Sequence, residues 1–188
     1  MERPRFFPGL TGTTDPTLKD VHEHIRLWRV DTLATVEALR ADRREVDDNQ
    51  KHLESPEALY EYVDFFVNEF TRRIDELDQI VAELQSGPRR SHVDALRQIA
   101  RHAAAEQRRC LQFRDKWVNR PLPHEQVRPL LNRILSNTRD QLVDYYEMTN
   151  AARQIAAFTG SEPATGQKGI GRRELFSRLL RRDRDGRS

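Results

Sequence analysis

Six histidines and one cysteine are the residues of this 188-residue chain that could bind a metal ion or attack a substrate. A di-iron helical bundle needs a glutamate three residues before a histidine on two helices, because residues at that spacing share one helix face. The residue three positions before each histidine is Lys, Val, Asn, Arg, Ile or Pro, so the pattern is not met. His22 and His24 would point about 200° apart on a helix. The sequence therefore predicts no metal site and no cofactor.

Cys110 is the single thiol of the sequence. It falls on the apolar stripe of a predicted helix, which is typical of a buried structural cysteine. Arg108 and Arg109 would lower the pKa of this thiol only if it were exposed. No nucleophile elbow, phosphate-binding glycine loop or dinucleotide fingerprint occurs. Because no such motif occurs, we predict no catalytic residues. One cysteine cannot form an internal disulfide, which suits a reducing compartment, so we predict a cytoplasmic protein.

One short segment has a spacing with a catalytic counterpart. Arg97-Gln98-Ile99-Ala100-Arg101-His102 has an arginine, four residues and a histidine. This segment resembles the arginine–histidine motif of HEPN-type helical ribonucleases, although Gln98 is larger than the polar residue usual at its position. The resemblance covers six residues and implies that Arg97 and His102 act on an RNA phosphate at a dimer groove. A HEPN-like ribonuclease is therefore one alternative function.

The C-terminal segment carries the clearest binding pattern. Residues 161–171 contain glycines and a proline, which predicts a flexible tether before residues 172–188. On a helical wheel of residues 172–182, four apolar side chains lie within an arc of about 140°, and most of the arginines lie outside it. The apolar side chains are Leu175, Phe176, Leu179 and Leu180, and the basic ones are Arg172, Arg173, Arg178, Arg181 and Arg182. We therefore predict a basic amphipathic helix that becomes ordered when it docks.

Three alternatives follow for this tail. In the favoured one, its apolar side enters a groove on another protein, and the chain is a non-enzymatic adaptor, cargo or assembly factor. This layout resembles that of cargo proteins of bacterial protein shells, without a matching shell-targeting consensus. In the second, the tail binds nucleic acid or an anionic membrane electrostatically. In the third, it packs on its own bundle. A homo-oligomer fits the first alternative, and no small-molecule substrate is evident.

The remaining sequence predicts the elements that carry the tail. Residues 1–14 contain prolines and glycines and should form an extended arm, in which Phe6 and Phe7 are a second candidate contact. Apolar residues recur every three or four positions over four stretches within residues 15–160. No stretch shows the two-residue alternation of a strand. The fold class predicted is all-α, an antiparallel four-helix bundle with an extended N-terminal arm and a tethered C-terminal amphipathic helix.

Prolines and glycines predict the helix ends. Asp15 is expected to cap the first helix before Pro16, and that helix should fade near Arg43. Ser55-Pro56 should start the second helix, and Gly160 should end the fourth. Trp117 is expected as a buried anchor between the third and fourth helices, whereas Tyr145 and Tyr146 cannot both face the core.

The charges are unevenly distributed along the chain. The net charge of +2 comes from 32 basic and 30 acidic residues, but residues 164–188 hold eight basic and three acidic ones. The rest of the chain is therefore net acidic, and Arg89-Arg90 and Arg108-Arg109 read as isolated pairs. We accordingly expect only the tail to offer a nucleic acid a basic surface. No run of about 18 apolar residues occurs, so no membrane span is predicted.

Overall fold

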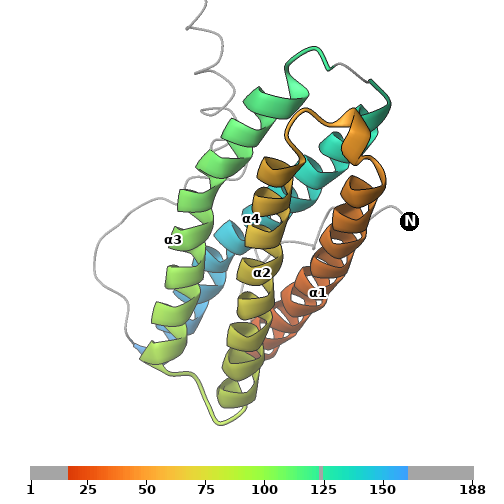
Figure 1. The fold of residues 1–188 in the computed structure, drawn as a ribbon. Helices are drawn as coiled ribbons and strands as arrows, with labels where there is room; N and C mark the ends of the chain where they lie inside the picture. The colour runs from red at the N-terminus through yellow and green to blue at the C-terminus, as the bar shows by residue number, and fades with distance from the viewer. Residues whose placement is uncertain (1–16, 123–124, 161–188) are drawn as a thin grey trace, which may run out of the picture.

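The computed structural model of the chain describes residues 17–122 and 125–160, which form four long α-helices (Figure 1). The helices are α1 (Leu18–Asp48), α2 (Pro56–Leu84), α3 (Arg90–Phe113) and α4 (Arg128–Thr159). No strand occurs within the described ranges. The all-α four-helix bundle is thus confirmed. The arm with Phe6 and Phe7 and the tail lie outside the described residues.

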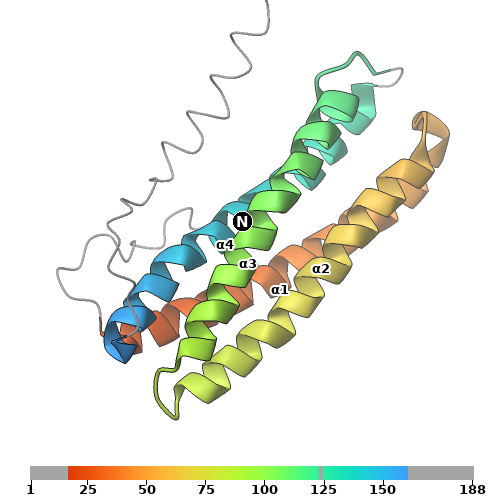
Figure 2. The same ribbon diagram turned by 90° about the vertical axis from the view of Figure 1, so that its left-hand side faces the viewer.

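The bundle consists of two antiparallel hairpins, α1–α2 and α3–α4, which form its two layers (Figure 2). α1 and α4 pack directly against each other across the layers, whereas the backbones of α2 and α3 approach closely at few positions. Side chains span that second boundary instead. For example, the Arg109 guanidinium of α3 lies 4.0 Å from the ring centre of Phe65 on α2.

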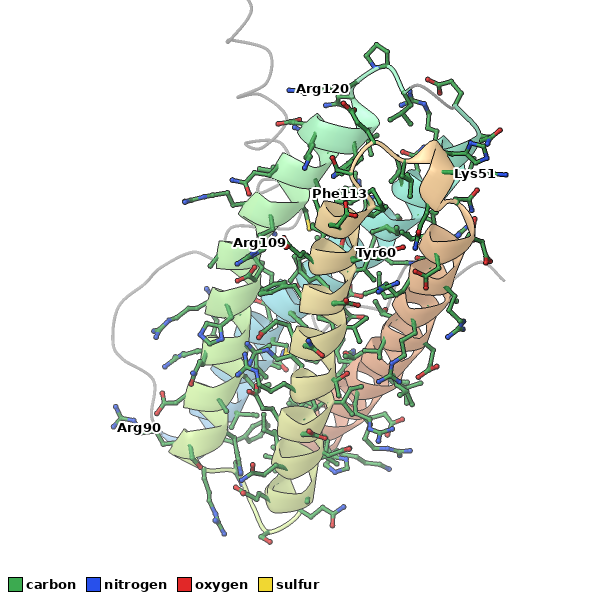
Figure 3. The ribbon with its side chains drawn as sticks, in the orientation of Figure 1. Lys51, Tyr60, Arg90, Arg109, Phe113 and Arg120 are labelled. Atoms are coloured by element: carbon green, nitrogen blue, oxygen red, sulfur yellow. The ribbon has the colours of Figure 1, made fainter. Side chains whose placement is uncertain are left out.

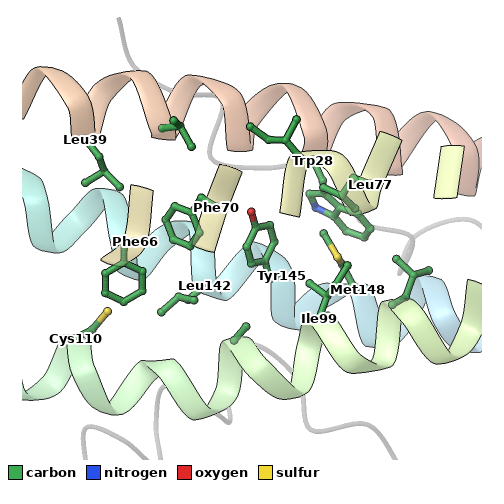
Figure 4. Packing of buried hydrophobic residues seen from close by; sticks show 14 of the residues in the cluster. Trp28, Leu39, Phe66, Phe70, Leu77, Ile99, Cys110, Leu142, Tyr145 and Met148 are labelled. Carbon is green, nitrogen blue, oxygen red and sulfur yellow. The ribbon is translucent and has the colours of Figure 1, made fainter. Parts of the chain in front are cut away.

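The apolar stripes of all four helices meet in one core (Figure 4). Phe66 and Phe70 of α2 contact each other in a tilted arrangement with ring centres 5.4 Å apart, and Phe70 meets Tyr145 of α4 edge to face at 5.6 Å. Fully burying one large apolar side chain contributes about 1.5–3 kcal/mol, so these stripes supply most of the stabilisation. Tyr145 lies in the core and Tyr146 is half-buried, which confirms the prediction that these neighbouring tyrosines cannot both face the core.

A buried polar layer fixes how α1 and α4 align. The Thr35 hydroxyl donates to the Gln141 side-chain oxygen at 2.8 Å, and the Gln141 amide donates to the Thr32 hydroxyl at 3.2 Å. The Tyr145 hydroxyl donates to the same Thr32 oxygen at 3.0 Å. Sliding one helix by a turn would break these hydrogen bonds between buried groups, which costs more than an apolar mismatch. The layer therefore sets the register between the two hairpins.

The first helix differs from the prediction at both ends. Its N-cap is Thr17 rather than Asp15, because Thr17 and Asp20 form a capping box: the Asp20 carboxylate accepts from the Thr17 amide at 2.7 Å, and the Thr17 hydroxyl accepts from the Asp20 amide. The helix also continues to Asp48 instead of fading near Arg43. Val46 extends its buried stripe by another turn, and Arg43 pairs with Asp47 at 2.8 Å.

The other helix ends follow the predicted signals closely. Pro56 lies in the first turn of α2, and Gly160 ends α4 in the left-handed conformation with φ +64°. Between α3 and α4 the chain makes a π-helical turn, Arg114–Val118. Trp117 in this turn is only 6% exposed, which confirms it as the anchor of that corner.

Candidate interaction surfaces

The outer face of α1 carries an apolar row, formed by Leu27, Val30 and Leu33. These side chains are 37%, 53% and 40% exposed. Ala34 and Ala41 extend the exposed apolar surface along the same helix. The core-facing stripe of α1 lies on the opposite side, so this helix is apolar on two faces, and the core needs only one of them.

Ion pairs flank the apolar row at both ends. Arg26 contacts Glu23 at 3.2 Å, and Arg40 contacts Glu37 at 2.7 Å, each pair lying within α1. All four side chains are largely exposed. An apolar centre with a polar rim is the usual composition of a protein–protein interface.

The outer face of α3 carries an arginine stripe, formed by Arg90, Arg97, Arg101 and Arg108. Their separations of seven, four and seven residues place them within about 40° on the helix. Arg97 is half-buried and the other three are exposed. Figure 3 shows Arg90, at the start of the stripe, projecting away from the bundle. In the sequence Arg90 and Arg108 read as members of isolated pairs, whereas the spacing of the four arginines along one helix is the signal that predicts a stripe.

The arginine stripe has no ion pair or hydrogen bond to any residue in the described part of the chain. Asp94, an exposed carboxylate on α3, makes no ion pair with it either. The neighbouring Arg109 behaves differently, because it pairs with Glu106 at 2.8 Å and covers the Phe65 ring. The stripe therefore holds four positive charges without an ion-pair partner among residues 17–122 and 125–160.

Arg73 is the main polar link from α2 to α3. Its side chain is 4% exposed and contacts Glu76 at 2.5 Å and Glu69 at 3.6 Å. Its other terminal nitrogen lies 2.6 Å from His102 Nδ1, which must accept the hydrogen bond because a guanidinium only donates. Arg97, the other residue of the ribonuclease-like motif, lies about 140° from His102 around α3. The structure thus places His102 in contact with Arg73, whereas Arg97 lies in the arginine stripe on the outer face of α3.

Cys110 lies in a buried contact of three helices. The Tyr62 hydroxyl of α2 donates to Cys110 Sγ at 3.3 Å and lies 2.9 Å from the Thr138 hydroxyl of α4. Burial raises the pKa of the Cys110 thiol, and it also raises the pKa of Tyr62. The thiol stays protonated at neutral pH, and the prediction of a buried structural cysteine is confirmed. Within the described ranges no three His, Cys, Asp or Glu side chains are grouped as metal ligands.

A cleft of about 280 Å³ lies between α2 and α3 over Ile80 and Ala95. Glu83 and His92 line it, and the buried His92 ring donates from Nε2 to the Glu83 carboxylate at 3.3 Å. His92 Nδ1 accepts from the Arg89 amide at 3.2 Å. Hydrogen bonds from Gln79 and then His92 lower the pKa of Glu83. The His92 and Glu83 groups are therefore used within the protein, so the apolar row and the arginine stripe are the two better candidate surfaces.

The predicted partner-binding residues of the tail, Leu175, Phe176, Leu179, Leu180 and the arginines between 172 and 182, lie outside the described residues, as do Phe6 and Phe7. Among the residues that are described, no helix combines the length and apolar character needed to cross a membrane. Comparison of the chain with known protein families, with curated proteins and with solved structures found no match.

Proposed function

We propose that the protein is a non-enzymatic protein-interaction module that serves as an adaptor, cargo or assembly factor. The observation that carries this proposal is the apolar row of α1. Leu27, Val30 and Leu33 lie on successive turns of α1. Each CH₂ group of these side chains that a partner removes from water contributes about 0.8 kcal/mol to the free energy of binding.

A helix of another protein fits this surface best. Leu27, Val30, Ala34 and Ala41 recur at separations of three, four and seven residues, which is the spacing at which one helix faces another. The small side chains of Ala34 and Ala41 allow the two backbones to approach closely. The flanking pairs Glu23–Arg26 and Glu37–Arg40 would lie at the rim, where they can remain hydrated.

The basic amphipathic tail is the second contact in this proposal. Its support is the sequence pattern of residues 172–182, in which apolar and basic side chains take opposite sides of a helical wheel. In this proposal the bundle supplies the rigid body, and residues 161–171 would serve as the tether predicted from their composition, so that the tail could reach a groove on the same partner. Two linked contacts raise the overall affinity through effective concentration, even if each alone is weak.

Site-specific photo-crosslinking in the cells that make the protein tests the proposal. A photoreactive amino acid at Val30 in the full chain should crosslink to another protein, identified by mass spectrometry. The same amino acid at Glu61, an exposed position of α2, is the control and should crosslink far less. Adding Leu27→Ser and Leu33→Ser should reduce the Val30 crosslink several-fold. Equal yields at Val30 and Glu61, or no protein crosslink at Val30, would contradict the proposal.

A further inference from the structure

The two layers of the bundle carry opposite charge. α2 holds eight acidic and two basic residues, whereas α3 holds two acidic and five basic ones. α1 is also more acidic than basic, and α4 is slightly more basic than acidic. The small net charge of the whole chain conceals this separation. The basic side of the molecule is centred on the arginine stripe.

We propose that the arginine stripe of α3 is a sequence-independent binding site for the phosphate backbone of a nucleic acid. Arg90, Arg97, Arg101 and Arg108 extend over about 27 Å of one straight helix, at about 1.5 Å per residue. Each guanidinium presents a planar set of donors that matches a phosphate group. A linear row of guanidinium groups that have no carboxylate partner among the described residues therefore fits a linear chain of phosphate groups.

The charges around the stripe support an external anion. Like charges on one helix face destabilise the helix by a few tenths of a kcal/mol per pair, and Asp94 is the single carboxylate among the exposed residues of α3. On α1 and α2 most arginines have a carboxylate partner within the bundle, as Arg29 has in Asp78 at 2.9 Å. The stripe arginines have no such partner in the part of the chain that the structure describes, so within the bundle their donors remain available to a ligand.

The side chains beside the stripe favour nucleic acid over the other anionic partners. The further exposed residues of α3 are Gln98, Ala104, Ala105, Arg109 and Gln112, together with Ser91. A peripheral membrane helix needs large apolar side chains that enter the lipid, and a protein interface needs a buried apolar or aromatic centre. Neither is exposed on α3. Binding to a phosphate backbone requires charge alone, and charge is what this face supplies.

Fluorescence anisotropy with the full chain tests this site. The probes are a labelled 20-nucleotide single-stranded RNA and the corresponding duplex, titrated at several salt concentrations between about 50 and 200 mM. Four phosphate contacts should lower the association constant about a hundredfold over this range, because each contact releases condensed counterions. Circular dichroism of every variant checks that the helices are intact.

Three double variants with the same loss of charge separate the possible sites. Arg97→Gln with Arg101→Gln removes half of the stripe and should weaken binding at least tenfold and reduce the log–log salt slope by about 1.5–2. Arg26→Gln with Arg40→Gln removes two exposed but paired arginines of α1 and should change binding less than twofold. Arg181→Gln with Arg182→Gln measures the share of the tail.

Four results would overturn the proposal. The first is no binding of either RNA at the lowest salt concentration. The second is equal weakening by the stripe and α1 variants, and the third is weakening by the tail variant alone. The fourth is binding to phosphatidylserine-containing vesicles with the same affinity and the same dependence on the stripe, which would assign the stripe to an anionic membrane. None of these results depends on the apolar row, so the proposed protein interaction stands or fails separately.

Discussion

The first hairpin, α1–α2, and the helix α3 use arginine in opposite ways. Counting carboxylates of the described residues, six of the seven arginines on α1 and α2 contact one, whereas on α3 only Arg109 does. The paired arginines connect turns of one helix or join neighbouring helices, and Arg73 even enters the interior. The stripe arginines contribute nothing comparable to the fold. Arginine on the first hairpin therefore serves stability, and arginine on α3 is available for function.

The largest effect expected from this comparison is at Arg73. Arg73→Ala would remove the buried donor of one Glu76 oxygen and of His102 Nδ1, and losing a hydrogen bond of a charged group costs about 1.5–3 kcal/mol of the free energy of unfolding. Arg72 contacts the same Glu69 and Glu76 but is exposed, so Arg72→Ala should cost less than about 1 kcal/mol. Urea unfolding of both variants measures the difference. Equal losses would show that burial does not distinguish the two arginines.

The next largest effect is expected in the polar layer between the hairpins. Gln141→Leu removes the side-chain oxygen that accepts from the buried Thr35 hydroxyl and one donor to Thr32, and should cost about 1–3 kcal/mol. Gln79→Leu removes an exposed amide that donates to Glu83 and should change stability by less than about 0.5 kcal/mol. Urea unfolding again provides the measurement. A neutral Gln141→Leu would mean that apolar packing alone sets the α1–α4 register.

The Cys110 thiol gives a chemical test of how tightly the hairpins meet. Burial raises its pKa, so the folded state favours the protonated thiol. The stability that this contributes is present below the pKa of the unfolded thiol, about 8.5, and decreases as the pH rises above it. At pH 8 we expect iodoacetamide to alkylate native Cys110 at least about a hundredfold more slowly than the urea-unfolded chain. Similar rates would mean that the Tyr62–Cys110–Thr138 contact opens readily.

The smallest effects on stability are expected at the two proposed surfaces. Arg97→Gln with Arg101→Gln, and Leu27→Ser with Leu33→Ser, should each change the free energy of unfolding by less than about 0.5 kcal/mol per site, because these side chains are on outer faces. Thermal unfolding followed by circular dichroism tests both. A loss of several kcal/mol at the stripe would assign those arginines to the fold and remove the contrast with α1 and α2.

The helices and their core faces could be predicted because they depend on nearby residues. The recurrence of apolar residues from Leu59 to Leu84 places one stripe on α2, and Pro56 determines where that helix can begin. Gly160 ends α4 because its positive φ suits glycine. Trp117 was found for the same local reason, as a large aromatic beside two prolines.

The polar contacts could not be predicted, since their partners are distant in the sequence. Asp42 reads as a solvated residue, yet it is buried and its carboxylate accepts from Arg133 at 2.5 Å and from Asn137 at 3.0 Å. The pairing of Arg73 with His102 across two helices is equally hidden. The apolar row escaped notice for a different reason, because Leu27 and Val30 lie off the periodic stripe that identifies the core.

The backbones of α2 and α3 approach closely at few positions, so the two hairpins contact each other unevenly across the bundle. α1 packs directly against α4, whereas α2 and α3 meet through core side chains and through polar ones such as Arg73, Tyr62 and Arg109. If the two hairpins moved apart, the opening would start between α2 and α3, because fewer close backbone contacts must break there. The aromatic rings of Phe65 and Phe113 would then become exposed to water before α1 and α4 had separated.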